Sequence, residues 1–140
     1  MANGVSTGPH WSAIVAAARS CIGTRFRPHG RVPALALDCV GVVLVAAAAA
    51  GIEVPMLPAY RIGGTLPDID AIFLGCGARR VDAALPGDVL SIAPAPEQVH
   101  FGIVTPAGLV HVHAGLDRVV EGPVDCMWAI IGAWRLPGAR

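Results

Sequence analysis

The hydrophobic pattern of this chain changes its period once, and that change constrains the fold more than any other feature. In roughly the first 52 residues, apolar residues either recur three or four positions apart or run without interruption, as they do in helices. From Ala78 onward the period becomes two, in short segments separated by Pro, Gly and Asp. Helices followed by antiparallel strands are typical of an α+β fold. The sequence therefore predicts N-terminal helices packed on a C-terminal antiparallel β-sheet.

Two helices are expected in the first part of the chain. In Pro9 to Ile22 the apolar residues fall three or four apart, and Gly23 follows as a stop. Cys39 to Ala50 is apolar on every side, Asp38 is a good N-cap, and Gly51 suits the left-handed position after the last turn. This second helix is expected to be central and buried.

The remaining elements are short. Loops are expected over Thr24 to Pro33 and Glu53 to Gly64, a short helix over Asp68 to Leu74, and strands over Val89 to Ala93, Val99 to Val104, Leu109 to Ala114, Arg118 to Glu121 and Trp128 to Leu136. The tryptophans Trp11, Trp128 and Trp134 are expected to anchor the core.

Composition limits the number of domains and the kinds of partner. A chain of 140 residues that is 54% hydrophobic is expected to form a single domain over residues 1–140. Its ten basic residues, all arginine, and its ten acidic residues are scattered, which argues against nucleic acid or a membrane surface as partner. No secretory signal is recognisable, so synthesis in the cytoplasm and reduced thiols are expected. The longest apolar stretch, Cys39 to Ile52, is too short to cross a bilayer.

Cys39 is the candidate nucleophile. In the first turn of a helix, a thiol lies close to unpaired backbone N–H groups and to the positive end of the helix dipole, which lowers its pKa. The same N–H groups are suited to stabilise an oxyanion. The alternative is that Cys39 is a small buried hydrophobic residue, as free cysteines often are. The other three cysteines, Cys21, Cys76 and Cys126, have no such context and are assigned to packing or to the surface.

Three histidines, His100, His111 and His113, are expected to share one face of a hairpin. The turn over residues 105–108 sets a register in which Gly102 lies opposite His111. The same register places His100 opposite His113. Three histidines on one face of one hairpin are unusual in a hydrophobic core, but a functional site would explain them.

His100 is the candidate general base for the Cys39 thiol, and a second group must orient its ring. His113 is its direct cross-strand neighbour, at about 5 Å between Cβ atoms, and His111 is the diagonal neighbour at about 7 to 8 Å. Both are within reach, so the spacing alone leaves the choice open.

A zinc site is the alternative use of the same residues. His111 and His113, with Cys39 or His100, supply three or four ligands. The sequence has neither a close Cys-x-x-Cys pair nor a helical pair of histidines, the usual zinc-binding patterns. Zinc binding would also not explain why the cysteine stands at the start of a helix. A cysteine hydrolase without metal or other cofactor is therefore the preferred interpretation.

Four motifs occur in a fixed order: Leu37 to Gly41, Leu85 to Val89, His100 to Val104 and Leu109 to His111. This combination resembles the NlpC-type cell-wall cysteine peptidases of the papain-like group, over about Trp11 to Pro137. Residues 17–24, the strand at Arg118 to Glu121 and the closing Trp134 to Pro137 resemble more particularly the short versions encoded with phage tails and gene transfer agents.

The resemblance implies a papain-like α+β fold with Cys39 as nucleophile, His100 as base and a polar third residue on the next strand. For the third residue we prefer His111, with His113 as the alternative. The implied substrate is a peptidoglycan stem peptide, cut at the bond between γ-D-glutamate and a diamino acid. In the family, the aspartate before the cysteine can bind the free amine of the stem peptide, so Asp38 is a candidate for substrate binding, with helix capping as its alternative role.

The sequence departs from the family at two positions near the expected site. A tyrosine usual in the loop before the cysteine is matched here by Phe26, which lacks the hydroxyl, and the residue after the cysteine is Val40 where serine is common.

The function predicted from the sequence is a peptidoglycan endopeptidase associated with a phage tail or gene transfer agent, acting on the cell wall as part of a particle. Other tail proteins are its possible partners. The alternatives are a tail-tip structural protein that does not need the chemistry of its fold, and an amidase or acyltransferase.

Overall fold

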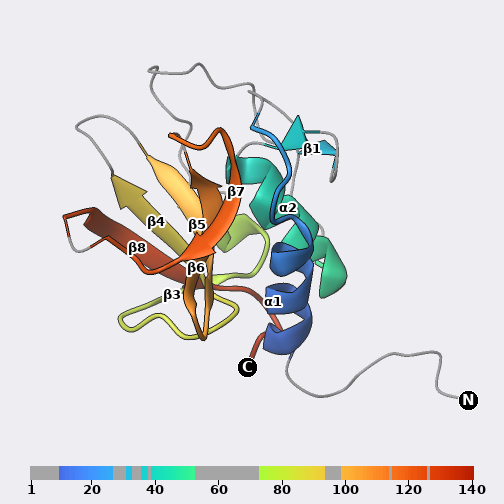
Figure 1. Cartoon of the computed structure of the whole chain (residues 1–140). Coiled ribbons are helices and arrows are strands. Elements are labelled where there is room, and N and C mark those ends of the chain that lie inside the picture. Colours follow the sequence, from blue (N-terminus) through green and yellow to red (C-terminus); the bar gives the residue numbers. More distant parts are fainter. Residues whose placement is uncertain are drawn as a thin grey trace, which may run out of the picture.

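A computed structural model describes residues 10–26, 31–32, 36–37, 39–52, 73–93, 99–113, 115–125 and 127–140 (Figure 1). The elements follow the order α1 (Trp11–Ser20), β1 (Arg31–Val32), β2 (Ala36–Leu37), α2 (Cys39–Ala49), β3 (Arg79–Val81), β4 (Val89–Ala93), β5 (His100–Thr105), β6 (Gly108–His113), β7 (Arg118–Gly122) and β8 (Ala129–Arg135). Both helices precede the large sheet, as the change of period predicts.

The two helices form where the sequence predicts them. α1 buries Ile14, Val15 and Ala18, and Gly23 with φ of 90° follows its end. α2 buries residues on most of its sides along the first three quarters of its length, in keeping with its uniform apolar character. Gly51, with φ of 74°, lies just beyond it in the left-handed region.

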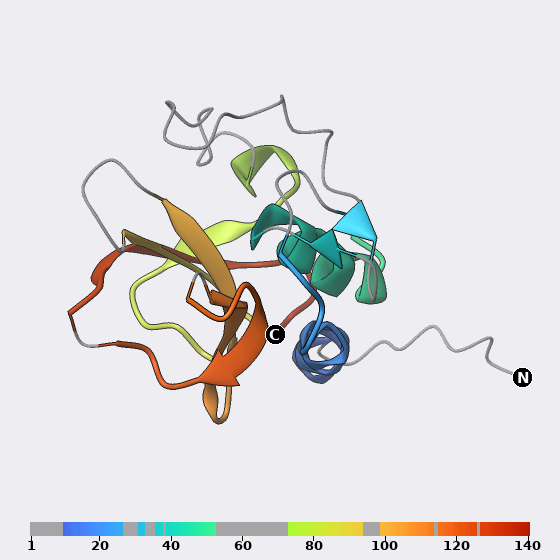
Figure 2. The ribbon, with the colours of Figure 1, turned by 45° about the horizontal axis from the view of Figure 1, so that its top comes forward.

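The large sheet has six antiparallel strands in the order β3-β8-β4-β5-β6-β7. Both helices lie on the same side of it (Figure 2). The hairpin register is the predicted one, because Gly102 pairs with His111 across β5 and β6. This register decides which histidines meet.

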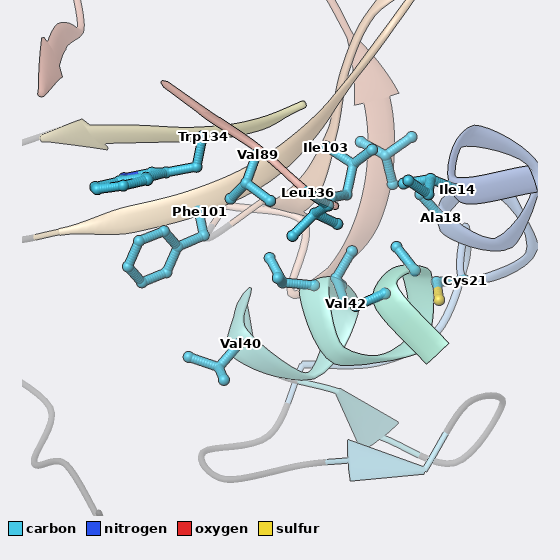
Figure 3. Packing of buried hydrophobic residues seen from close by; sticks show 14 of the residues in the cluster. Ile14, Ala18, Cys21, Val40, Val42, Val89, Phe101, Ile103, Trp134 and Leu136 are labelled. Atoms are coloured by element: carbon cyan, nitrogen blue, oxygen red, sulfur yellow. The ribbon is translucent and has the colours of Figure 1, made fainter. Parts of the chain in front are cut away.

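The sheet has a different hydrophobic cluster on each face. On the helix side, residues such as Phe101, Ile103 and Val110 pack with α1 and α2, and Figure 3 shows Ile103 near Ile14. On the other side, the buried residues are Leu90, Ile92, Leu109 and Ala133. His111 lies between Val110 and Val112, which belong to the helix-side cluster, so the alternation directs its ring to the second side.

The local structure differs from the expectations at two places. Residues 31–32 were expected in a loop but form β1, which pairs with β2, and β3 was not expected. A strand of two or three residues is too short to show alternation, and in β3 two consecutive exposed arginines hide it further. Of the helix expected at Asp68 to Leu74, only Phe73 and Leu74 are among the described residues, and both are helical. The loop expected at Glu53 to Gly64 lies outside them.

A buried ion pair joins the start of β4 to β8. Asp88 is fully buried, and its carboxylate accepts hydrogen bonds from Arg135 Nε at 3.0 Å and Arg135 Nη2 at 2.8 Å. The backbone N–H of Leu85 donates to the same carboxylate at 2.8 Å. Between them, Gly87 has φ of 94°, and a Cβ there would lie 2.8 Å from Cβ of Trp11. Asp88 is therefore a structural residue of the turn that leads into β4.

Candidate active site

Cys39 is the first residue of α2 and is half-buried against the helix-side cluster. Cys39 therefore lies in the first turn of the helix, at the positive end of the dipole. Among the described cysteines, Cys21, Cys39 and Cys76 form no disulfide. The position of Cys39 at a helix start is the one that the sequence predicts for it.

The start of β5, the end of β6 and the first turn of α2 lie at the same end of the molecule (Figure 1). α2 packs against both of these strands. The fold therefore brings the first turn of α2, with Cys39, to the end of the molecule where β5 begins with His100, although these two residues are about sixty positions apart in the chain.

His100 and His111 are in direct contact. Nε2 of His100 lies 3.2 Å from Nδ1 of His111, and the ring centroids are 5.4 Å apart with an interplanar angle of 82°. Gly102, which pairs with His111, lies tightly against β6, since a Cβ there would lie 2.8 Å from the carbonyl oxygen of Val110 and closer still to the Leu109 side chain. The ring that contacts His100 is thus that of its diagonal cross-strand neighbour, His111.

The hydrogen bond between His100 Nε2 and His111 Nδ1 needs one hydrogen, which either of the two nitrogens can carry. If His100 Nε2–H donates to His111 Nδ1, the Nδ1 of a neutral His100 keeps its lone pair and can accept a proton. If His111 Nδ1–H donates instead, the Nδ1 of a neutral His100 is already protonated. The carbonyl oxygen of Val112, 3.2 Å from His111 Nδ1, accepts from His111 Nδ1–H in the second arrangement, and in the first it is a further acceptor for the His100 ring. Only the first arrangement allows His100 to act as a base.

Burial and, to a smaller extent, a neighbouring histidine lower the pKa of both rings. Burial, followed by the neighbouring His111, lowers the pKa of His100 to about 4, and the Val112 carbonyl partly opposes this shift. Burial also lowers the pKa of His111, with His113 adding to the effect and the Val112 carbonyl again opposing it. Near neutral pH the pair is therefore uncharged and able to accept a proton from a thiol.

Acidification is expected to destabilise the folded protein through these rings. Their pKa values are lowered on folding, so the unfolded chain binds more protons, and stability present above about pH 6.5 is lost as the pH falls toward 4. In urea unfolding, the wild type should lose about 2 to 3 kcal/mol more between about pH 7 and pH 4 than His100→Asn, allowing for the partial exposure of His100.

The matched control for this measurement is His113→Asn, which changes an exposed ring on the same hairpin. It should lose somewhat less stability on acidification than the wild type but more than His100→Asn, because His113 supplies only a minor part of the lowering of the His111 pKa. Equal losses in the wild type and His100→Asn would contradict the expectation.

His113 occupies a different position from His111. It is exposed, and its Nδ1 accepts a hydrogen bond from the backbone N–H of Leu116 at 3.1 Å in the turn before β7. Its ring lies 6.2 Å from that of His111. The three histidines share a face as predicted, but His111 is the one that contacts His100.

The other sequence candidates are placed as follows. Phe26 is partly buried against the helix-side cluster, and its backbone N–H donates to the carbonyl of Asp117 at 2.9 Å. Asp38 and Cys126 lie outside the described residues. Trp134 is buried as expected and stacks on Phe73, but Trp128 is only half-buried and contacts His111, with ring centroids 5.3 Å apart. The sequence has no signal for that contact, because it depends on how β6 and the segment before β8 meet in space.

Within the part of the chain that the structure describes, no group of three or more His, Cys, Asp or Glu side chains is arranged to hold a metal ion. None of the helices described there combines the length and the apolar character that crossing a membrane requires.

The fold is similar to that of NlpC/p60 proteins. NlpC1 from Trichomonas vaginalis matches with a TM-score of 0.70 at 16% identity, over 94% of this chain and 46% of that one, so this chain spans about half its length. The NlpC/p60 domain of the peptidoglycan hydrolase SagA matches with a TM-score of 0.58 at 25% identity, over 88% of this chain and 96% of that one.

A third similar structure is RipD from Mycobacterium tuberculosis, a non-catalytic NlpC/p60 domain protein adapted to peptidoglycan binding. It matches with a TM-score of 0.59 at 18% identity, over 91% of this chain and 96% of that one. No protein-family model matches the chain, and no curated protein matches its sequence. The likenesses confirm the predicted papain-like NlpC/p60 fold, and the proteins that share it include a peptidoglycan hydrolase and a non-catalytic protein.

Proposed function

We propose that this protein is a cysteine peptidase that hydrolyses peptidoglycan stem peptides between γ-D-glutamate and a diamino acid. The observation that carries the proposal is the contact of His100 with His111 at the end of the sheet where α2 begins with Cys39. A thiol at a helix start and a neutral imidazole with an oriented ring are the two groups that thiol hydrolysis requires.

The reaction starts with proton transfer from the Cys39 thiol to Nδ1 of His100, because Nε2 of that ring faces His111. The thiolate adds to the amide carbonyl, and the backbone N–H groups of the first turn of α2 are suited to bind the resulting oxyanion. When the C–N bond breaks, His100 gives its proton to the leaving amine, and a thioester on Cys39 remains. Water, deprotonated by His100, then cleaves the thioester, releasing a carboxylic acid and restoring the thiol.

His111 orients His100 in this scheme. By accepting from His100 Nε2–H, it selects the tautomer whose Nδ1 is free to take the proton. His113 is less suited to this role because its Nδ1 already accepts a hydrogen bond from Leu116. In this proposal Asp38 binds the free amine of the stem peptide, because the motif around Cys39 resembles that of the NlpC-type peptidases.

A second candidate function is peptidoglycan binding without hydrolysis, as in RipD. The presence of Phe26 in place of the usual tyrosine favours this alternative. An amidase or acyltransferase would use the same thiol and imidazole. Action on the cell wall within a phage tail or gene-transfer particle, after synthesis in the cytoplasm, is an extension of the proposal that rests on the sequence resemblance.

Selective alkylation tests whether the thiol is activated. Iodoacetamide should label Cys39 below about pH 7 at least about tenfold faster than Cys76, since a lowered thiol pKa increases the thiolate fraction by that order. The rate at Cys39 should fall toward that of Cys76 in His100→Ala. Cys76 is a suitable internal reference because it is also half-buried, whereas burial raises the pKa of Cys21. Labelling of Cys39 no faster than Cys76 would argue for the binding protein.

A further inference from the structure

His111 is held between two other aromatic rings. On one side is His100, and on another the indole of Trp128, whose centroid is 5.3 Å away at an interplanar angle of 79°. Only 4% of His111 is exposed, although its side chain is polar. Trp128 thus supplies part of the cover that keeps water from this ring.

The contact joins parts of the sheet that are not neighbours. Trp128 directly precedes β8, His111 belongs to β6, and β4 and β5 lie between these strands. The indole also packs against the second-side cluster that contains Leu109. It therefore covers this side of the sheet up to the histidine pair.

A tight turn sets the direction of Trp128. The Asp125 carboxylate accepts a hydrogen bond from the Met127 backbone N–H at 2.9 Å, and the Asp125 carbonyl accepts one from the Trp128 N–H at 3.0 Å. Met127 is 85% exposed, whereas Trp128 is half-buried. The turn sends the first side chain to solvent and the second onto His111.

Packing, rather than an ionic partner, controls the orientation of His111. Its ring contacts in the described structure are His100, His113 and Trp128, with the Val112 carbonyl beside Nδ1. Across on β7 the residue paired with it is Val120, whereas the two charged residues of that strand, Glu121 and Arg118, pair with Val110 and His113. The contact with the indole adds to the polar contacts at Nδ1 in keeping the ring from rotating.

We propose that Trp128 is a positioning residue of the candidate site, which holds His111 with its Nδ1 toward Nε2 of His100 and excludes water from that contact. As a catalytic inference it rests on the proposed peptidase function, but the arrangement of the rings can be measured without substrate. Removing the indole lets water compete for Nδ1 of His111 and lets the ring turn. His100 then loses the acceptor that fixes its tautomer.

The test compares Trp128→Leu with Met127→Ala, a matched change at the exposed neighbour. NMR of ¹⁵N-labelled histidine reports the tautomer and titration of His100 and His111, and kinetics on a γ-D-glutamyl-diamino acid peptide report kcat and KM. In Trp128→Leu the pKa of His111 should rise toward its ordinary value, and kcat should fall about 10- to 100-fold with little change in KM. Trp128→Phe should restore most of the lowered pKa of His111 and most of kcat, and Met127→Ala should match the wild type in both.

A second pair of variants moves the indole without removing it. Asp125→Ala loses the side-chain acceptor of the turn, whereas Asp125→Asn keeps an oxygen there. Asp125→Ala should shift the histidine signals in the same direction as Trp128→Leu, by less, and Asp125→Asn should not. These variants answer the question even if Trp128→Leu does not fold.

The outcomes separate the two proposals. Shifted histidine signals in Trp128→Leu with no hydrolysis by any variant, wild type included, would keep the positioning role and reject the peptidase. Histidine signals identical to the wild type in Trp128→Leu and Asp125→Ala would overturn the role of Trp128, whatever the activity.

Discussion

Replacing Cys39 with alanine is expected to abolish hydrolysis of a γ-D-glutamyl-diamino acid peptide while leaving the chain folded. The variant has no atom to form the thioester, and His100 alone does not replace a nucleophile, so kcat should fall by about 10³-fold or more. Alanine is the best helix former, and Cys39 is only half-buried, so the start of α2 should survive the change. Mass spectrometry of the peptide products and urea unfolding measure the two effects separately.

Cys76→Ala is the matched control, since it removes another half-buried thiol that has no place in the proposed site. It should cleave the peptide at the wild-type rate. If Cys39→Ala retained hydrolysis, Cys39 would not be the nucleophile. A folded wild type that binds peptidoglycan but cleaves no peptide would instead support the function known for RipD.

The sequence predicts the parts of the site that depend on local patterns. The apolar run with Asp38 before it and Gly51 after it predicts where α2 begins, and so places Cys39 in a first turn. Alternation and a short turn fix the β5–β6 register, which pairs Gly102 with His111. Both predictions succeed because the deciding interactions lie within a few residues or across one hairpin.

Contacts that depend on the order of strands could not be predicted in this way. The Asp88–Arg135 pair spans 47 positions and requires β8 to lie beside β4, and the contact of Trp128 with His111 requires the same sheet order. The choice between His111 and His113 as the ring beside His100 also needed coordinates. The cross-strand spacing brings either ring within reach of His100, but Nδ1 of His113 accepts a hydrogen bond from Leu116 in the turn before β7.

Replacing Asp88 with alanine is expected to destabilise the fold strongly, although the residue lies away from the site. The side chain of Arg135 is only 12% exposed, so its guanidinium would remain largely buried without its carboxylate, and the N–H of Leu85 would lose its acceptor. Breaking a buried ion pair on one side costs about 3 to 5 kcal/mol, because the remaining charge is not solvated. The free energy of unfolding in urea should fall by that amount.

The control is an ion pair of similar length at the surface. Arg19 Nη2 lies 3.0 Å from Glu121 Oε2, but 42% of the Arg19 side chain is exposed. Arg19→Met keeps the apolar part of that side chain and should cost less than about 1 kcal/mol, since water screens the pair. The contrast isolates burial as the cause, because both changes remove one partner of an Arg–carboxylate pair. A loss in Asp88→Ala as small as that in Arg19→Met would mean that water reaches Arg135 once the carboxylate is gone, and that the turn at the start of β4 does not depend on the pair.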